Sequence, residues 1–224
     1  MKGLFITFEG PDGAGKSTQL GKLAEYLEEQ KIPFIRTREP GGTDIGDMIR
    51  SILLDPSNGN LTHKTEVLLY AASRAQHVQE VIQPALEAGK VVLCDRFVDA
   101  SIAYQGYGLD LSLESVKLIN EFAINGISPD RTYMIDLPPD EGRQRMKSRH
   151  KPKQVDYELD RIEQKNLMYH QKVREGFHKI YEENKQRICL LDGSQSIDDI
   201  FQHIVQDFQH FYKTSTSVSN HEIM

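Results

Sequence analysis

The chain has 224 residues, and its 27 lysines and arginines against 33 aspartates and glutamates give a formal net charge of −6. Nucleic acids and anionic membranes attract basic surfaces, so this charge argues against either as the main partner. The length suits one domain, and a hydrophobic content of 38% can supply a sizeable core.

Apolar runs typical of strands alternate with segments of helical periodicity. The expected strands are Leu4–Glu9, Pro33–Thr37, Val91–Asp95, Arg131–Leu137 and Ile188–Asp192. The expected helices are Lys16–Gln30, Asp44–Leu54, Thr62–Ala88, Leu113–Ile124, Asp140–Arg149, Asp156–Asn184 and Ser196–Phe211. This alternation predicts an α/β fold, a parallel sheet with helices on both faces. Such sheets bind ligands beyond the carboxyl ends of their strands.

The first strand leads into a phosphate-binding pattern, G-P-D-G-A-G-K-S. Its glycines permit positive φ angles, so successive backbone N–H groups can converge on phosphate oxygens at a helix N-terminus. Lys16 adds a charge near the β- and γ-phosphates, and Ser17 offers a hydroxyl to Mg²⁺. The expected ATP-binding residues are Gly10, Pro11, Asp12, Gly13, Ala14, Gly15, Lys16, Ser17 and Thr18. A turn that merely caps a helix is the alternative, and the coincidence of strand, loop and helix argues against it.

The segment Thr62–Ala88 reads as one long helix that Pro84 disturbs. Tyr70, Arg74 and His77 are four and three residues apart and therefore share one helix face. A flat aromatic beside an arginine suits a planar heterocycle that stacks on one and hydrogen-bonds the other. A core aromatic with a surface arginine explains this segment equally well.

The third strand ends in Asp95 and Arg96. An acidic residue there can hold Mg²⁺ beside the phosphate loop, and an arginine can clamp a phosphate with two hydrogen bonds. The sequence thus predicts a metal site at Ser17 and Asp95. On the short helix expected next, Gln105 offers the donor and acceptor that a pyrimidine edge requires.

A basic run, Gly142 to Arg161, is an exception in this acidic chain. A solvated helix or a nucleic-acid patch would also produce it, but no aromatic residues interleave with its basic core. We expect a mobile lid, about residues 142–160, whose arginines close over the transferring phosphate and exclude water. Residues 1–213 should form a single domain, followed by a flexible Ser/Thr-rich tail, 214–224.

Six sequence blocks span nearly the whole chain. They are F-E-G-P-D-G-A-G-K-S-T at 8–18, R-E-P-G-G-T at 38–43, L-L-Y-A-A-S-R at 68–74, C-D-R-F at 94–97, S-x-x-Y-Q-G at 101–106 and D-R-I-E at 160–163. In these blocks the chain resembles the thymidylate kinase family. The resemblance implies a P-loop NTPase fold, a three-layer α/β/α arrangement with a central five-stranded parallel sheet, and a homodimer. It also implies phosphoryl transfer from ATP to dTMP with Mg²⁺.

Roles for individual residues follow from the resemblance. It assigns dTMP binding to Asp12, Glu39, Arg50, Tyr70, Arg74, Arg96, Ser101, Tyr104 and Gln105. It assigns catalysis to Lys16, Asp95, Arg96, Arg145 and Arg149. Tyr70, where family members often have Phe, would stack on thymine. Gly13 follows the acidic residue of the phosphate loop, so the chain resembles the branch whose lid supplies the catalytic arginine.

Other functions remain open from the residues: a kinase for another nucleoside monophosphate, a P-loop switch that transfers no phosphate to a small molecule, or a nucleic-acid-binding module. Against a GTPase-like switch, the chain has no N-K-x-D motif. Its only cysteines, Cys94 and Cys189, lie in apolar runs and predict free thiols. No stretch has membrane-spanning length and no signal-peptide pattern is present, so we expect a cytoplasmic protein without a membrane partner.

Overall fold

The computed structural model describes residues 3–149 and 159–218 and is built around a five-stranded parallel sheet with the strand order β2-β3-β1-β4-β5. The strands are β1 (Leu4–Glu9), β2 (Phe34–Arg38), β3 (Val91–Asp95), β4 (Arg131–Asp136) and β5 (Ile188–Asp192). All five predicted strands are therefore confirmed, with ends displaced by at most one residue.

Helices connect the strands. They are α1 (Lys16–Glu29), α2 (Asp44–Leu54), α3 (His63–His77), α4 (Gln83–Glu87), α5 (Val98–Ser101), α6 (Leu113–Ile124), α7 (Pro139–Arg149), α8 (Leu167–Glu183) and α9 (Ile197–Val218), with a short 3₁₀ turn, η1 (Pro56–Asn58). Two π-helical segments, η2 (Val78–Ile82) and η3 (Ile102–Gly108), continue α3 and α5. Within the described ranges, no helix combines the length and the apolarity needed to cross a bilayer.

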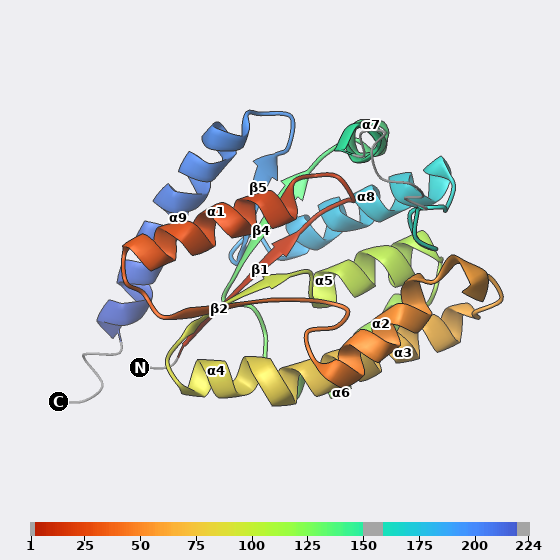
Figure 1. Ribbon diagram of the computed structural model, residues 1–224, viewed down its shortest axis with the longest axis horizontal. Helices are drawn as coiled ribbons and strands as arrows, with labels where there is room; N and C mark the ends of the chain where they lie inside the picture. Colours follow the sequence, from red (N-terminus) through yellow and green to blue (C-terminus); the bar gives the residue numbers. More distant parts are fainter. Residues whose placement is uncertain (1–2, 150–158, 219–224) are drawn as a thin grey trace.

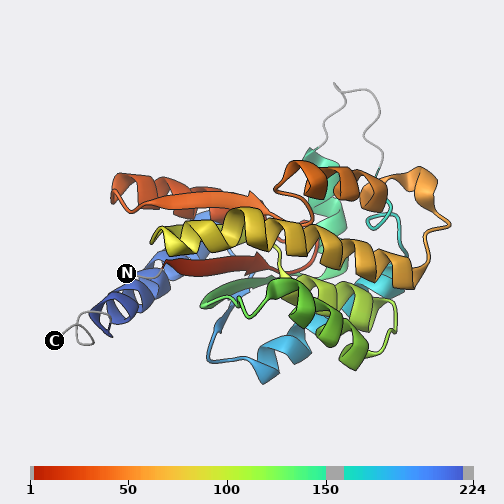
Figure 2. The ribbon, with the colours of Figure 1, turned by 90° about the horizontal axis from the view of Figure 1, so that it is seen from below.

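Helices cover both faces of the sheet because its strands are apolar on both sides. Ile6 and Phe8 of β1 pack with α1 and α9 in one buried cluster, whereas Phe5 belongs to another cluster with residues of η2 and α4. Figure 1 shows α1 and α9 side by side over one face, and in Figure 2, seen from below, the helices of the opposite face lie in front of the strands. The predicted three-layer α/β/α arrangement is confirmed.

The long helix predicted for Thr62–Ala88 is interrupted where the sequence indicates. The N–H of Gln83 bonds to the carbonyl of Val78, five residues back, which is a π-helical step. Pro84 follows directly and has no N–H to donate, so the regular pattern is lost at this point. The three segments α3, η2 and α4 nevertheless form one continuous rod, drawn in orange and yellow in Figure 2.

Two helix boundaries differ from the prediction. The helix expected from Asp156 begins at Leu167, because Asn166 caps it by accepting a hydrogen bond from the N–H of Tyr169 at 2.9 Å. Asp160 binds the N–H groups of Ile162 and Glu163 at 2.8 Å each, which forms a turn instead. The last helix, expected to end at Phe211, continues to Val218. Part of the expected tail is therefore helical.

Candidate active site

The carboxyl ends of β1, β2 and β3 lie at one edge of the sheet, and backbone hydrogen bonds continue past them. The N–H of Arg96 donates to the carbonyl of Phe8, and the N–H of Glu39 donates to that of Asp95, both at 2.9 Å. The segments that follow the three strands are thus fixed relative to one another. Residues distant in sequence meet there, as the position of the strand ends predicts.

The phosphate loop follows β1 and has the backbone that its glycines predict. Gly10, Gly13 and Gly15 have φ angles of 131°, 78° and 106°. Lys16, the first residue of α1, is buried and donates to the carbonyls of Gly10 at 3.1 Å and Pro11 at 2.8 Å. Burial, together with the charge of Arg96, lowers the pKa of Lys16 to about 8. A phosphate on the loop would place negative charge beside this buried ammonium group and would raise its pKa again.

Ser17 and Asp95 fit a magnesium site at this loop. The hydroxyl of Ser17 donates to Asp95 Oδ2 at 2.6 Å, so two hard oxygen ligands are adjacent. Among the described residues, no group of three or more His, Cys, Asp or Glu side chains could hold a metal ion. Mg²⁺ bound with nucleotides takes one or two protein oxygens and completes its shell with phosphates and water. The donor set suits that mode of binding.

Arg96 is fixed over the phosphate loop. Its backbone is left-handed, with a φ angle of 70°, which is strained for a residue with a Cβ. Its guanidinium donates to the carbonyl of Gly10 at 3.1 Å, to the carboxylate of Asp12 and to the hydroxyl of Tyr104 at 3.0 Å. Burial alone would raise the pKa of Asp12, but the charges of Arg96 and Lys16 lower it below its usual value. Arg96 is therefore pre-oriented by an ionised partner.

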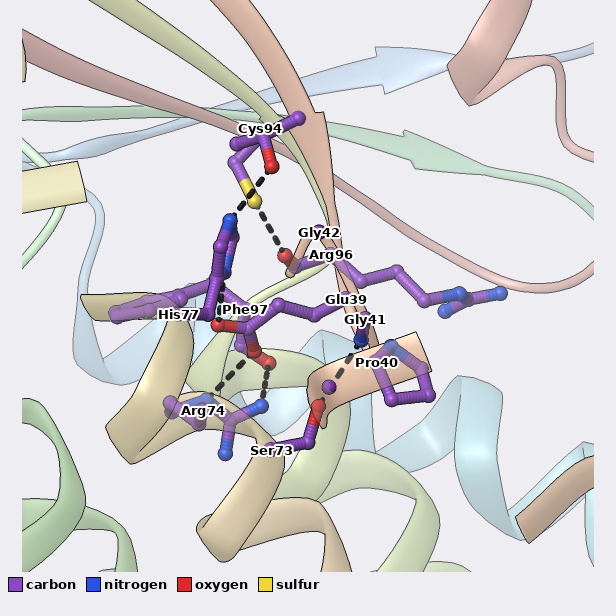
Figure 3. A network of polar contacts seen from close by, with 12 residues as sticks. Glu39, Pro40, Gly41, Gly42, Ser73, Arg74, His77, Cys94, Arg96 and Phe97 are labelled. Carbon is purple, nitrogen blue, oxygen red and sulfur yellow. Dashed lines mark hydrogen bonds and ion pairs between the residues drawn. The ribbon is translucent and has the colours of Figure 1, made fainter. Parts of the chain in front are cut away.

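A buried charged cluster forms where β2 meets α3 (Figure 3). Glu39 is 4% exposed, and its two carboxylate oxygens contact Arg74 Nε at 2.7 Å and His77 Nδ1 at 3.0 Å. The other ring nitrogen of His77 lies 2.6 Å from the hydroxyl of Thr37. Both oxygens of Glu39 are thus engaged within the protein. The role in dTMP binding that the resemblance assigns to Glu39 remains a prediction.

Arg74 is the centre of this cluster and is only 2% exposed. Besides Glu39, its guanidinium contacts Ser101 Oγ at 3.0 Å, the side-chain oxygen of Asn120, and the carbonyl of Phe97 at 3.0 Å. Within the described part of the chain, these contacts use four of the five N–H groups of the guanidinium, so that one is left for a ligand. The structure excludes the alternative of a solvated surface arginine at this position.

A cavity of about 360 Å³ lies between the phosphate loop and the cluster. All residues that the resemblance assigns to dTMP line it: Asp12, Glu39, Arg50, Tyr70, Arg74, Arg96, Ser101, Tyr104 and Gln105. Lys16, Ser17 and Asp95 line it as well. The structure therefore brings a phosphate-binding loop and the residues expected at the acceptor site to one continuous space.

Helix α7 rests directly on the phosphate loop. A Cβ on Gly13 would lie 2.4 Å from the carbonyl oxygen of Gly142, and one on Gly142 would lie 2.3 Å from that of Asp12. Only glycines allow this approach. The next residue, Arg143, donates to the carbonyl of Lys165. The start of the predicted lid is thus packed against the nucleotide loop.

The catalytic arginines predicted for the lid are not placed in the cavity. Arg145 lies on α7 and is not among the lining residues, although the neighbouring Met146 is. The side chain of Arg149 and residues 150–158 lie outside the described residues. The catalytic roles of Arg145 and Arg149 remain predictions.

One arginine of the basic run is not a lid residue. Arg161 is 8% exposed and donates to the buried carboxylate of Glu66 at 2.7 Å, so it cannot close over a phosphate as the sequence led us to expect. Glu66 itself was missed, although it precedes Tyr70 and Arg74 by four and eight residues and so shares their helix face. That spacing could have identified Glu66 as a residue of the site.

Glu9, the last residue of β1, was also missed. It is fully buried, and its Oε1 accepts hydrogen bonds from the N–H groups of Phe97 at 2.7 Å and Ala100 at 3.4 Å. Within the described part of the chain, no partner reaches its Oε2. Burial and the charge of Asp99 raise the pKa of Glu9 to about 8. A carboxyl at the end of an apolar strand was the signal for this site.

We expect Glu9 to make the stability of the protein depend on pH. Its pKa rises from a usual 4.5 to about 8 on folding, so between these values the folded chain keeps a proton that the unfolded chain releases. The contribution of Glu9 to the free energy of unfolding is complete below pH 4.5 and is lost as the pH rises through 8. Glu9→Gln mimics the protonated carboxyl and should flatten the fall in melting temperature from pH 5 to 8 by several degrees, at about 2–4 °C per kcal/mol.

Thermal unfolding of both proteins at several pH values measures this effect. Glu25→Gln, at an exposed position of α1, is the matched control and should follow the wild type. Parallel curves for the wild type and Glu9→Gln would contradict the raised pKa.

Comparison with known proteins identifies similar chains. The family model described as "Thymidylate kinase" matches residues 8–204. The chain is 50% identical over 219 residues to a thymidylate kinase of Exiguobacterium sibiricum, covering 98% of this chain and 100% of that protein. It is 48% identical to that of Lactobacillus acidophilus, covering 93% and 95%. The crystal structure of thymidylate kinase from Ehrlichia chaffeensis superimposes with a TM-score of 0.73 at 32% identity, covering 93% and 99%.

Proposed function

Since this chain belongs to the thymidylate kinase family, we propose that it transfers the γ-phosphate of ATP to dTMP and produces dTDP and ADP. The observation that carries the proposal is the shared cavity. Lys16 and Ser17 of the phosphate loop line the same space as Arg74 and Gln105, the residues expected at the base. A donor and an acceptor bound there would lie close enough for direct transfer.

The acceptor side has groups that suit a pyrimidine deoxynucleotide. Tyr70 presents an aromatic ring, and Arg74 has one N–H left to donate. Gln105 is 1% exposed, and its carbonyl oxygen has no partner among the described residues. The side-chain oxygen of Gln105 would accept from the N3–H of thymine.

Phosphoryl transfer needs little covalent help from the protein, because the attacking phosphate of the acceptor is already anionic. Arg96 and Arg50 would hold this phosphate, and Lys16 would neutralise charge on the donor phosphates. Ser17 and Asp95 would hold Mg²⁺, which supplies further charge neutralisation when bound. Arg145 and Arg149 would add positive charge from the lid.

Turnover with ATP and a panel of dTMP, dUMP, UMP, dCMP and dGMP tests the proposal. A coupled assay for ADP should show the highest kcat/KM with dTMP. Preference for another monophosphate would favour the rival kinase, and nucleotide binding without turnover of any acceptor would favour the switch.

The homodimer expected from the resemblance has a suitable surface. Helices α3 and α6 pack against each other and expose three large apolar side chains: Leu68 (57%), Leu118 (66%) and Phe122 (90%). Exposed apolar groups gathered on neighbouring helices are typical of interfaces. We propose that this face pairs with its copy in a second chain.

Phe122→Asp should convert the dimer into a monomer, because a carboxylate would have to be buried against its own copy. Sedimentation velocity at micromolar concentration measures the change as a shift to half the mass. Ile197→Asp, at an exposed apolar residue of α9, is the control and should leave the mass unchanged. A variant at Phe122 that sediments like the wild type would refute this interface.

Two further predictions belong to the proposal: the protein works in the cytoplasm, and it does not use nucleic acid as a partner. The net charge of −6 supports the second. A gel-shift titration with DNA at low salt should show no retardation.

A further inference from the structure

We propose that Glu66 and Arg161 set the hydrogen-bonding polarity of Gln105, so that the base subsite selects a pyrimidine with a proton on N3. Thymine and uracil carry that proton, whereas N3 of cytosine is an acceptor. The inference rests on the proposed function, because it concerns the acceptor base. It adds two residues that do not themselves line the cavity.

The orientation of the Gln105 amide follows from its contact with Glu66. Gln105 Nε2 donates to Glu66 Oε1 at 3.0 Å. An ionised carboxylate can only accept hydrogen bonds, so the NH₂ group of the amide must face Glu66 and its carbonyl oxygen must face away. This oxygen is buried without a partner in the described part of the chain. A donor that reaches it satisfies a buried acceptor, whereas another acceptor placed there would leave two unsatisfied.

Arg161 supplies the charge that keeps Glu66 in the accepting role. Glu66 is fully buried, and a buried carboxylate needs a hydrogen-bonded cation. Arg161 Nη2 provides it at Glu66 Oε2, 2.7 Å away. Each oxygen of Glu66 therefore has a fixed donor, one from Arg161 and one from Gln105.

Arg161 is itself held by the end of α2. Its Nε donates to the carbonyl of Leu53 at 2.8 Å, and its backbone N–H donates to the carbonyl of Leu54 at 3.0 Å. These carbonyls belong to the last turn of the helix, where they have no partner within it. The guanidinium cannot turn away from Glu66 without breaking its hydrogen bond to Leu53. Three segments distant in sequence thus fix one amide at the base subsite.

The variant Glu66→Gln reverses this polarity with almost no change in shape. The new amide would turn its carbonyl oxygen to Arg161, which can only donate, and its NH₂ group to Gln105. Gln105 would then rotate its own amide and present NH₂ to the base. We expect the ratio of kcat/KM for dTMP over dCMP to fall about 100-fold or more, with dUMP changing as dTMP does.

Three measurements decide the proposal. Calorimetric titration of the wild type and of Glu66→Gln with dTMP and with dCMP, without ATP, gives the dissociation constants. The preference for dTMP in binding should fall in the variant as it does in kcat/KM. Gln105→Ala should lower the wild-type preference for dTMP over dCMP at least tenfold, because Arg74 is then the one remaining group of the pair that distinguishes the bases. In the Gln105→Ala background, Glu66→Gln should leave the ratio unchanged, as expected for residues that act through one another.

The failures are distinguishable. Wild-type turnover of dTMP with an unchanged dTMP-to-dCMP ratio in Glu66→Gln would overturn this inference alone. If kcat/KM of Glu66→Gln fell equally for dTMP and dCMP and its melting temperature were lower, the role of Glu66 would be merely structural. That result would also overturn the inference. If Glu66→Gln does not fold, Gln105→Ala decides, and an undiminished preference for dTMP over dCMP in that variant refutes the inference. A wild-type protein that does not phosphorylate dTMP overturns the proposed function and this inference together.

Discussion

Replacing Lys16 by alanine should lower kcat by about 10²–10³-fold, the loss typical for a group that stabilises developing charge. The ammonium group is buried at the first turn of α1, and its hydrogen bonds within the described residues go to the backbone carbonyls of Gly10 and Pro11. Burial and the charge of Arg96 lower its pKa, although Asp12 and Asp95 act in the opposite direction. The phosphates of ATP would supply further negative charge, most strongly during transfer.

Steady-state kinetics with ATP and dTMP measure this loss, and a melting curve separates it from unfolding. Lys16→Ala removes two hydrogen bonds, at about 1 kcal/mol each, but also a desolvated charge, so the melting temperature should change little. Lys22→Ala is the matched control on the same helix. Lys22 forms a surface ion pair with Asp198 at 2.9 Å and should retain full activity. Wild-type kcat in Lys16→Ala would refute its role.

Arg74→Ala should cost about 3–5 kcal/mol of stability and abolish the use of dTMP. The substitution removes the cation from a cluster in which Glu39 is 4% exposed and Asn120 is 1% exposed. Removing one partner leaves an uncompensated buried charge, which is more costly than removing the pair. Urea denaturation measures the loss as a lower midpoint with an unchanged slope.

Two controls make the interpretation of Arg74→Ala specific. Arg174→Ala, on α8, breaks a more exposed pair with Asp136 at the end of β4 and should cost about 1 kcal/mol or less. The double variant Arg74→Leu with Glu39→Gln removes both charges and should regain part of the stability without regaining activity. Equal costs for Arg74→Ala and Arg174→Ala would show that burial of the Glu39 charge is not the cause.

The parts of the fold that local sequence determines could be predicted. The strands are contiguous apolar runs, and the phosphate loop depends on glycines whose backbone freedom is a property of each residue. The end of β3 was equally accessible, because Asp95 directly follows a fully buried run. In each case the deciding information lies within a few residues.

The parts that depend on distant partners could not be predicted. Arg161 lies in a basic run and reads as a lid residue, but it binds Glu66, which is 95 residues away. Nothing near either residue identifies the other. The predicted start of α8 was wrong for a different reason. Helical periodicity continues upstream of Leu167, whereas side-chain hydrogen bonds form a turn at Asp160 and a cap at Asn166, so that the helix begins only after them.

The backbone hydrogen bonds that continue beyond the carboxyl ends of β1, β2 and β3 limit how the chain can be re-engineered. Deleting one residue within β3 would exchange the faces to which Asp95 and Arg96 point, because side chains alternate along a strand. The turn before β4 at Asn125 and Gly126 is exposed, and both residues have a left-handed backbone. New termini for a circular permutant, or an inserted reporter domain, belong at that turn.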